Sequence, residues 1–158
     1  MSMALICMGR LKEKYWRDAA AEYEKRLTRY TRFETIELPD LPEPQNSSPA
    51  SELQISEREG AAILSKLLPD DMVIALCIDG KQLDSVQLSK KLMQLQDNGK
   101  RIVFIIGGSL GLCDAVVARA NVKLSFSPMT FPHQLARIML LEQVYRACKI
   151  AAGERYHK

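Results

Sequence analysis

The residues best suited to chemistry lie in two short segments of the C-terminal half and at the C-terminus. One is the glycine cluster Gly107-Gly108-Ser109-Leu110-Gly111, and the other is residues 127–133, Ser-Pro-Met-Thr-Phe-Pro-His. Glycines let backbone N–H groups approach a ligand without a Cβ in the way. The chain has two histidines, His133 and His157. Because imidazole titrates near neutral pH, both are candidates for moving a proton.

The elements that must position these segments follow from the hydrophobic pattern. Short, largely apolar runs at 4–8, 34–38, 72–78, 102–106 and 122–126 predict strands that are covered on both faces. Helical patterns lie between and after them, at 15–28, 52–67, 86–96, 113–118 and 134–151. This alternation predicts an α/β fold with an open, mostly parallel sheet flanked by helices.

Capping residues support several of these boundaries. Ser51 with Gln54, and Asp84 with Gln87, have the spacing of capping boxes, and Gly153 is a natural helix stop. The proline-rich stretch 39–51 is expected to be a surface loop.

Ligands of open α/β sheets bind outside the carboxyl ends of the strands. Asp79-Gly80, the glycine cluster and residues 127–133 follow the third, fourth and fifth expected strands, so they are expected to form the site. The glycine cluster matches neither a P-loop nor a G-x-G-x-x-G fingerprint. Taken alone, it is either a ligand loop or a tight turn. A nucleotide-dependent oxidoreductase would carry that fingerprint after its first strand, with an acidic ribose ligand about 20 residues on, and neither is found.

Length and composition narrow the class of protein. With 158 residues, 47% apolar and 26% charged, residues 1–158 are expected to form one globular domain. Four cysteines without a C-x-x-C pair exclude a zinc ribbon and indicate buried thiols in a reducing compartment. No apolar run approaches the roughly 18 residues that span a bilayer. We therefore expect a cytoplasmic protein without a metal site or a membrane anchor.

Charge is distributed unevenly along the chain. Residues 10–32 contain eight bases and four acids, whereas residues 33–72 contain nine acids and two bases. Aromatic residues are interleaved with the basic ones, as in an RNA-contacting helix. The alternative is a solvated helix whose aromatic side chains face the core.

The last expected helix places a carboxylate on an apolar stripe. Glu142 lies at helical spacing from Leu135, Ile138 and Tyr145, so it needs a partner. Arg137, Arg146 or a group across an interface could supply it. The polar tail 153–158 that follows is expected to be frayed from its composition.

Four segments together resemble one known family. They are residues 105–111 (Ile-Ile-Gly-Gly-Ser-Leu-Gly), 124–137 (Leu-Ser-Phe-Ser-Pro-Met-Thr-Phe-Pro-His-Gln-Leu-Ala-Arg), 141–147 (Leu-Glu-Gln-Val-Tyr-Arg-Ala) and 156–158 (Tyr-His-Lys). This ordered set closely resembles the RlmH family of bacterial 23S rRNA pseudouridine methyltransferases, in the SPOUT (α/β-knot) superfamily. The resemblance runs the whole chain. Ser109-Leu110 stands where many members have Pro-Glu, and Lys158 where some have arginine.

The resemblance implies a C-terminal trefoil knot that holds S-adenosylmethionine. Knots are rare exceptions to the rules of chain connection, so no sequence pattern predicts one. The residues that it implies at the cofactor are Leu76, Gly107, Gly108, Ser127, Pro128, Met129, Thr130, Phe131 and Pro132.

The resemblance also implies the reaction and the partners. The product would be a pseudouridine methylated at N3 in 23S rRNA, formed on the assembled ribosome, with residues 10–32 as the candidate rRNA-facing region. The candidate catalytic residues are His133, Arg137, Tyr156 and His157. The tail would complete the site across a homodimer interface, so it is expected to be ordered when substrate is bound. His133 can equally be a structural residue at a helix start, and Arg137 can hold a phosphate or pair with Glu142.

A non-catalytic ribosome- or RNA-binding factor of α/β fold is the alternative. It would keep the basic stretch but would need neither a Thr-x-Pro-His loop nor a small-molecule pocket. Calorimetry with S-adenosylmethionine separates the two functions.

Overall fold

Five parallel strands form the centre of the molecule. The computed structural model describes residues 1–98 and 100–158. The strands are β1 (Ser2–Met8), β2 (Arg32–Leu38), β3 (Met72–Gln82), β4 (Ile102–Ile106) and β5 (Val122–Ser125). They form one sheet in the order β2-β1-β4-β3-β5, and every neighbouring pair is parallel. The predicted open, parallel α/β sheet is therefore confirmed.

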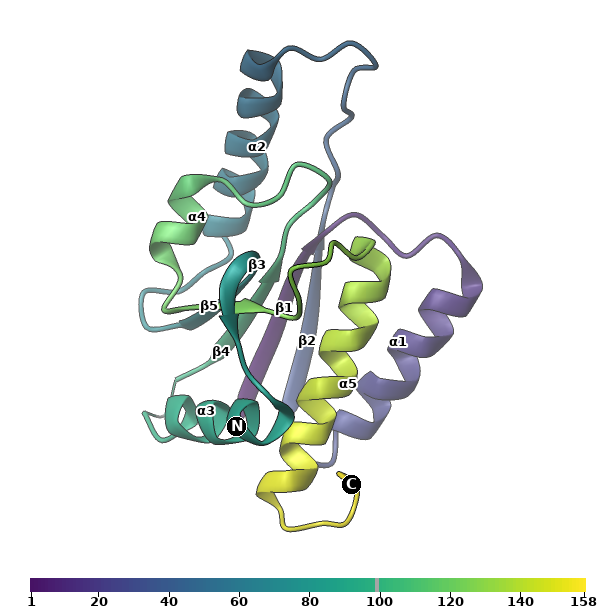
Figure 1. Cartoon of the computed structure of the whole chain (residues 1–158), viewed down its shortest axis with the longest axis vertical. Coiled ribbons are helices and arrows are strands. Elements are labelled where there is room, and N and C mark those ends of the chain that lie inside the picture. Colours follow the sequence, from purple (N-terminus) through teal and green to yellow (C-terminus); the bar gives the residue numbers. More distant parts are fainter. Residues whose placement is uncertain (99) are drawn as a thin grey trace.

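Helices cover both faces of this sheet (Figure 1). They are α1 (Lys14–Leu27), α2 (Pro49–Leu64), α3 (Ser85–Gln96), α4 (Asp114–Arg119) and α5 (His133–Ala151). The core on one face is formed with α1, α3 and α5, and the core on the other face with α2 and α4.

The alternation of side chains along β1 explains this two-sided packing. Met3, Leu5 and Cys7 join the core under α1, α3 and α5, whereas Ala4, Ile6 and Met8 join the core under α2 and α4. Every residue of β4 is buried as well. Edge strand β2 departs from the expected double coverage, because it exposes Arg32, Glu34 and Glu37. Charged side chains are tolerated at these positions because β2 is an edge strand, so part of it faces water.

Two helix boundaries test the capping analysis. The Asp84–Gln87 capping box at the start of α3 is confirmed in both directions. The box expected at Ser51 is wrong, because α2 begins earlier at Pro49 with Ser48 as its N-cap. The Ser48 hydroxyl accepts from the Ser51 N–H at 3.2 Å, and proline suits the first helical position.

Strand β3 is longer than its pattern predicts and contains a bulge. Leu124 of β5 lies opposite both Leu76 and Lys81, so residues 77–80 leave the ladder and the strand then resumes. Asp79-Gly80, expected after the strand, therefore lies inside it. A Cβ on Gly80 would come within 2.8 Å of the carbonyl carbons of Lys123 and Leu124. Glycine lets β3 return this closely to β5.

Two general expectations can be compared with the structure. Cys7 and Cys148 are buried, as predicted, whereas Cys77 and Cys113 are only partly buried, and all four are free thiols. Within residues 1–98 and 100–158, no helix is both long enough and apolar enough to cross a membrane.

Candidate functional site

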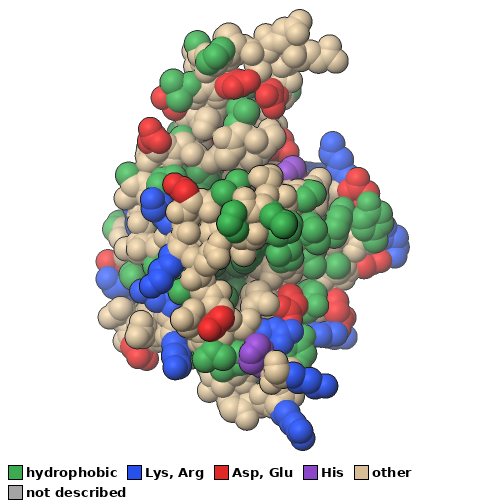
Figure 2. All heavy atoms as spheres, viewed as in Figure 1, with side chains coloured by type: hydrophobic (Ala, Val, Ile, Leu, Met, Phe, Trp, Pro, Cys, Tyr) green, Lys and Arg blue, Asp and Glu red, His purple; other side chains and the backbone are tan. Residues whose placement is uncertain are grey.

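A pocket opens where the carboxyl ends of β4 and β5 meet the bulge of β3. Its volume is about 470 Å³. Residues 76–78, 106–112, 124–127, 129–131, 133 and 136 line it. Two of the three segments singled out in the sequence, the glycine cluster and residues 127–133, therefore supply walls of one cavity. Asp79-Gly80 does not line it, and the β3 contribution comes from residues 76–78. In Figure 2, hydrophobic side chains gather near the centre of the view, over this part of the molecule.

Most of the residues predicted to hold a cofactor lie in this lining. They are Leu76, Gly107, Gly108, Ser127, Met129, Thr130 and Phe131. Pro128 and Pro132 belong to the same loop between β5 and α5, but both are exposed and neither is part of the lining.

The glycine cluster forms a tight turn that is also a wall of the pocket. The Gly111 N–H donates to the Gly108 carbonyl oxygen at 3.0 Å, and Gly111 has a φ of +76°. A Cβ on Gly107 would come within 2.9 Å of the Gly111 carbonyl carbon. The two interpretations of the cluster are thus compatible, because one compact turn also places backbone groups at the cavity.

A buried carboxylate that the sequence analysis missed lies behind this turn. Glu59 of α2 is only 6% exposed. A Cβ on Gly108 would lie 3.3 Å from its Oε1 and 3.4 Å from Oδ1 of Asp40. Burial raises the pKa of Glu59, a backbone hydrogen bond at Leu41 lowers it, and the charge of Asp40 raises it, with a net upward shift. The available signal was the i, i+4 spacing of Glu59 and Ile63 on one helix face.

Hydrogen bonds of two serine hydroxyls stabilise the loop between β5 and α5. The Ser127 hydroxyl accepts from the Met129 N–H at 3.0 Å, and the Ser125 hydroxyl donates to the Ser127 carbonyl oxygen at 3.1 Å. Met129 is 73% exposed at the rim of the pocket. An apolar side chain held in water beside a cavity is available to cover a ligand.

The bulge of β3 supplies two further lining residues that the sequence analysis missed, Cys77 and Ile78. Burial raises the pKa of the Cys77 thiol, Asp79 raises it further, and Lys123 lowers it. The thiol is therefore neutral near pH 7 and acts as a small apolar wall rather than as a nucleophile. Ile78 is 57% exposed. Sequence could have indicated both, because they end the apolar run 72–78 that comes directly before Asp79-Gly80.

The predicted catalytic residues of α5 lie in different surroundings. His133, the first residue of the helix, lines the pocket. Arg137 is outside the lining and 7% exposed. Its Nη1 donates to Oε2 of Glu37 at 2.7 Å, and its buried Nε has no hydrogen-bond partner among the described residues. The option that Arg137 pairs with Glu142 is therefore wrong.

The C-terminal tail folds back on α5 instead of fraying, which corrects the expectation from composition. The Tyr156 ring packs edge-on against Tyr145, with 5.0 Å between the ring centres. Its hydroxyl donates to Oε1 of Glu142 at 3.3 Å, and Arg146 Nη2 reaches the same oxygen at 2.6 Å. Arg146 is thus the partner that Glu142 needs. Nδ1 of His157 lies 3.3 Å from Nη1 of Arg146.

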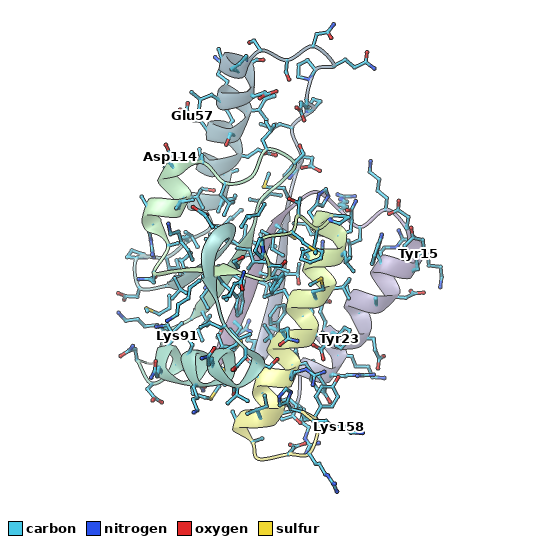
Figure 3. The ribbon with its side chains drawn as sticks, in the orientation of Figure 1. Tyr15, Tyr23, Glu57, Lys91, Asp114 and Lys158 are labelled. Carbon is cyan, nitrogen blue, oxygen red and sulfur yellow. The ribbon has the colours of Figure 1, made fainter. Side chains whose placement is uncertain are left out.

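Within one chain, this tail lies far from the pocket. Arg146, which contacts His157, is 13 residues beyond His133 on α5, or roughly 20 Å at 1.5 Å per residue. Figure 3 shows Lys158 near the lower end of the molecule, whereas α5 starts near the middle of the view. The structure therefore brings only His133, of the four predicted catalytic residues, to the cavity.

The acidic, histidine and cysteine side chains show no arrangement suited to a metal ion. Over residues 1–98 and 100–158, no group of three or more His, Cys, Asp or Glu side chains could hold one. The pocket instead combines apolar side chains, backbone groups and hydroxyls, which is the composition of a site for an organic ligand.

Two comparisons with known proteins are informative. A family model described as "Predicted SPOUT methyltransferase" matches residues 1–157. A solved structure described as "a probable methylase family protein from Haemophilus influenzae Rd KW20" is similar over 99% of this chain and 70% of that chain. Its TM-score is 0.56 at 12% sequence identity, so this likeness shows a shared fold.

Proposed function

The chain belongs to the SPOUT methyltransferase family, and from this we propose that it methylates N3 of a pseudouridine in 23S rRNA on the assembled ribosome. The observation that carries the proposal is the meeting of the β3 bulge, the glycine turn and residues 125–131 around one apolar cavity. The sequence resemblance to the RlmH family supplies the substrate. In this proposal residues 1–158 form one domain with the trefoil knot of that family.

The cavity fits S-adenosylmethionine in size and chemistry. Its volume of about 470 Å³ lies within the range of small-molecule sites. Leu76 and Phe131 provide apolar surface for an adenine, and the backbone at Gly107 and Gly108 can read its edge without a Cβ in the way. When bound, this cofactor supplies a methyl group that its cationic sulfur has already made transferable.

The residues of the chain must then hold the target base in line and manage its N3 proton. His133 is the titratable side chain at the pocket best suited to accept that proton. Arg137 lies outside the pocket lining with its charge paired by Glu37, so the proposal gives it no part in the proton transfer.

Tyr156 and His157 lie too far from the cavity of their own chain to act there. We therefore assign them to the cavity of a second copy in a homodimer. Exposed apolar side chains support an interface near the pocket, since Met129 and Ile78, which line it, are 73% and 57% exposed.

Mixed dimers test this arrangement. One variant, Gly107→Val, closes the pocket, because even a Cβ at this position lies 2.9 Å from the backbone of Gly111. The other variant lacks residues 156–158, and we expect it to bind S-adenosylmethionine with nearly the wild-type affinity in calorimetry. We expect each variant alone to be inactive toward ribosomes. Co-expressed at equal levels, they should regain about a quarter of wild-type activity, because half of the dimers then hold one complete site out of two.

A tail that acts within its own chain would give no activity in the mixture, and full activity of the tail-less protein would remove the tail from the reaction. A wild-type protein without affinity for S-adenosylmethionine would contradict the methyltransferase function itself and favour a non-catalytic RNA-binding factor.

A further inference from the structure

A second cavity lies beside the first, on the other side of the β3 bulge. Its volume is about 550 Å³, and it is bounded by α3, by the second half of β3 and by the start of edge strand β5. Four lysines line it, Lys81, Lys90, Lys91 and Lys123, which together we name the lysine groove. Asp79 is the one acidic residue in this lining. Figure 2 shows Lys and Arg side chains over this side of the molecule, on the left, and Figure 3 labels Lys91 there, on α3.

The charge of the lysine groove is not neutralised by the protein. Among residues 1–98 and 100–158, none of its four lysines has a carboxylate oxygen within 4.0 Å. Its excess of three positive charges equals the formal net charge of the whole chain, which is +3. Cations gathered in a hollow without partners raise the local concentration of anions and favour an anionic ligand.

The basic stretch of α1, the other candidate surface, differs in this respect. Lys14 pairs with Asp18 at 2.7 Å, Arg26 with Glu22 at 2.9 Å, and Arg29 lies 3.4 Å from Glu154. The guanidinium of Arg17 donates to backbone carbonyl oxygens of Leu11 and Lys12. These cations stabilise α1 and its contacts, and fewer of them are available to a partner.

The lysine groove and the pocket described above are both lined by the β3 bulge. Residues 77–80 leave the β3–β5 ladder together, with Cys77 and Ile78 lining the pocket and Asp79 and Gly80 lining the groove. An RNA strand that lies in the groove is therefore separated from the proposed cofactor pocket only by this short bulge.

We propose that the lysine groove binds the phosphate backbone of the RNA substrate and so places the target nucleotide at the pocket. This inference rests on the proposed function. Lysine is a mobile point charge suited to phosphates in varied positions, and phosphate contacts fix the register of an RNA without reading its bases. The amides of Gln87, Gln94 and Asn121, which also line the groove, add hydrogen bonds to sugar and phosphate oxygens.

A matched pair of double variants tests the lysine groove. Lys90→Gln with Lys123→Gln removes one charge from each wall. Arg58→Gln with Lys66→Gln removes the same charge from exposed, unpaired positions in and just after α2, on the opposite face of the sheet. The probe is a fluorescent RNA stem-loop with one pseudouridine, titrated by anisotropy between 25 and 200 mM salt. Calorimetry with S-adenosylmethionine checks that both variants keep a folded pocket.

We expect the groove variant to lose affinity for the RNA and the α2 variant to keep it. Loss of two phosphate contacts makes the slope of log affinity against log salt less steep by about 1.4. If the two proteins bind equally at about 1 M salt, this corresponds to a loss of roughly 25-fold in affinity at 0.1 M salt. Equal affinities of the two variants, or a weakened groove variant with an unchanged salt slope, would overturn the proposal. So would displacement of the RNA by polyglutamate at equal charge concentration, because an acidic protein would then fit equally well.

Failure of the proposed function gives a different result. In that case the groove variant still loses RNA affinity with the expected salt dependence, but wild-type protein supplied with S-adenosylmethionine leaves the pseudouridine of ribosomes unmethylated.

Discussion

Gly80 offers a direct test of how the β3 bulge shapes the site. In a Gly80→Ala variant the new methyl group would lie 2.8 Å from two carbonyl carbons of β5 and 2.9 Å from the Leu124 nitrogen. All three atoms belong to the backbone, so no side chain can rotate away to make room. The end of β3 must therefore separate from β5, at the pairs that Lys81 and Gln82 form with Leu124 and Ser125.

The cost of this separation follows from the size of the overlap. Forcing one extra methyl group into packed structure costs about 1 to 3 kcal/mol. For a chain of this length, 1 kcal/mol shifts the Tm by about 2 to 4 °C, so we expect a fall of about 6 °C. Because Cys77 and Ile78 move with the bulge, affinity for S-adenosylmethionine falls as well. Thermal unfolding and calorimetry on the same samples measure both effects.

Gly153→Ala is the matched control. No atom lies within 4 Å of its Cβ position, but its φ is +69°. Its cost is therefore conformational, about 1 kcal/mol, and it arises at the end of α5 away from the pocket. We expect a smaller fall in Tm and unchanged cofactor affinity. A Gly80→Ala protein with the stability and the cofactor affinity of wild type would refute the role given to this close approach.

Three further predictions concern the folded state. Burial would raise the pKa of Asp71, but the hydrogen bond from Arg101 holds it below its usual value; Asp71→Asn should therefore cost about 3 kcal/mol near pH 7 in urea unfolding, a loss that shrinks as the pH falls through the acid range. Glu59→Gln should stabilise the protein at pH 7 but not at pH 4, because burial raises the pKa of this carboxyl and the penalty for its charge grows as the pH rises through that pKa; equal effects at both pH values would contradict this. Burial raises the pKa of Cys7 and of Cys148 to about 11, so iodoacetamide at pH 8 should label both by mass spectrometry only after unfolding.

The sequence predicted best what local patterns determine. Strand β4 was predicted at its observed bounds, because its unbroken apolar run lies between Arg101 and Gly107 and leaves little choice of where the strand begins and ends. The meeting of the glycine cluster and the loop before α5 at one pocket followed from the geometry of parallel sheets, which places the carboxyl ends of neighbouring strands on the same edge. Asp79-Gly80, expected to join them, lies inside β3 and does not line the pocket.

What the sequence could not show depends on contacts between distant residues. The resumption of β3 at Lys81 is dictated by pairing with Leu124, and no local preference reveals it. The pairing of Arg137 with Glu37 joins residues 100 positions apart, whereas helical spacing suggested only neighbours such as Glu142. The composition of the tail likewise predicted fraying, but Tyr156 packs against Tyr145 and donates a hydrogen bond to Glu142 on α5. Composition cannot reveal these contacts.

The position of Ile78 connects the two proposals. This side chain is 57% exposed and lies on the bulge, with the apolar pocket on one side and the lysine groove on the other. An RNA strand held at its phosphates by the groove must direct one base across this residue to reach the pocket. Apolar surface lets a base leave its stack at lower cost, because the base face exchanges one apolar contact for another. Together the two proposals make the bulge the apolar surface over which the target base enters the pocket.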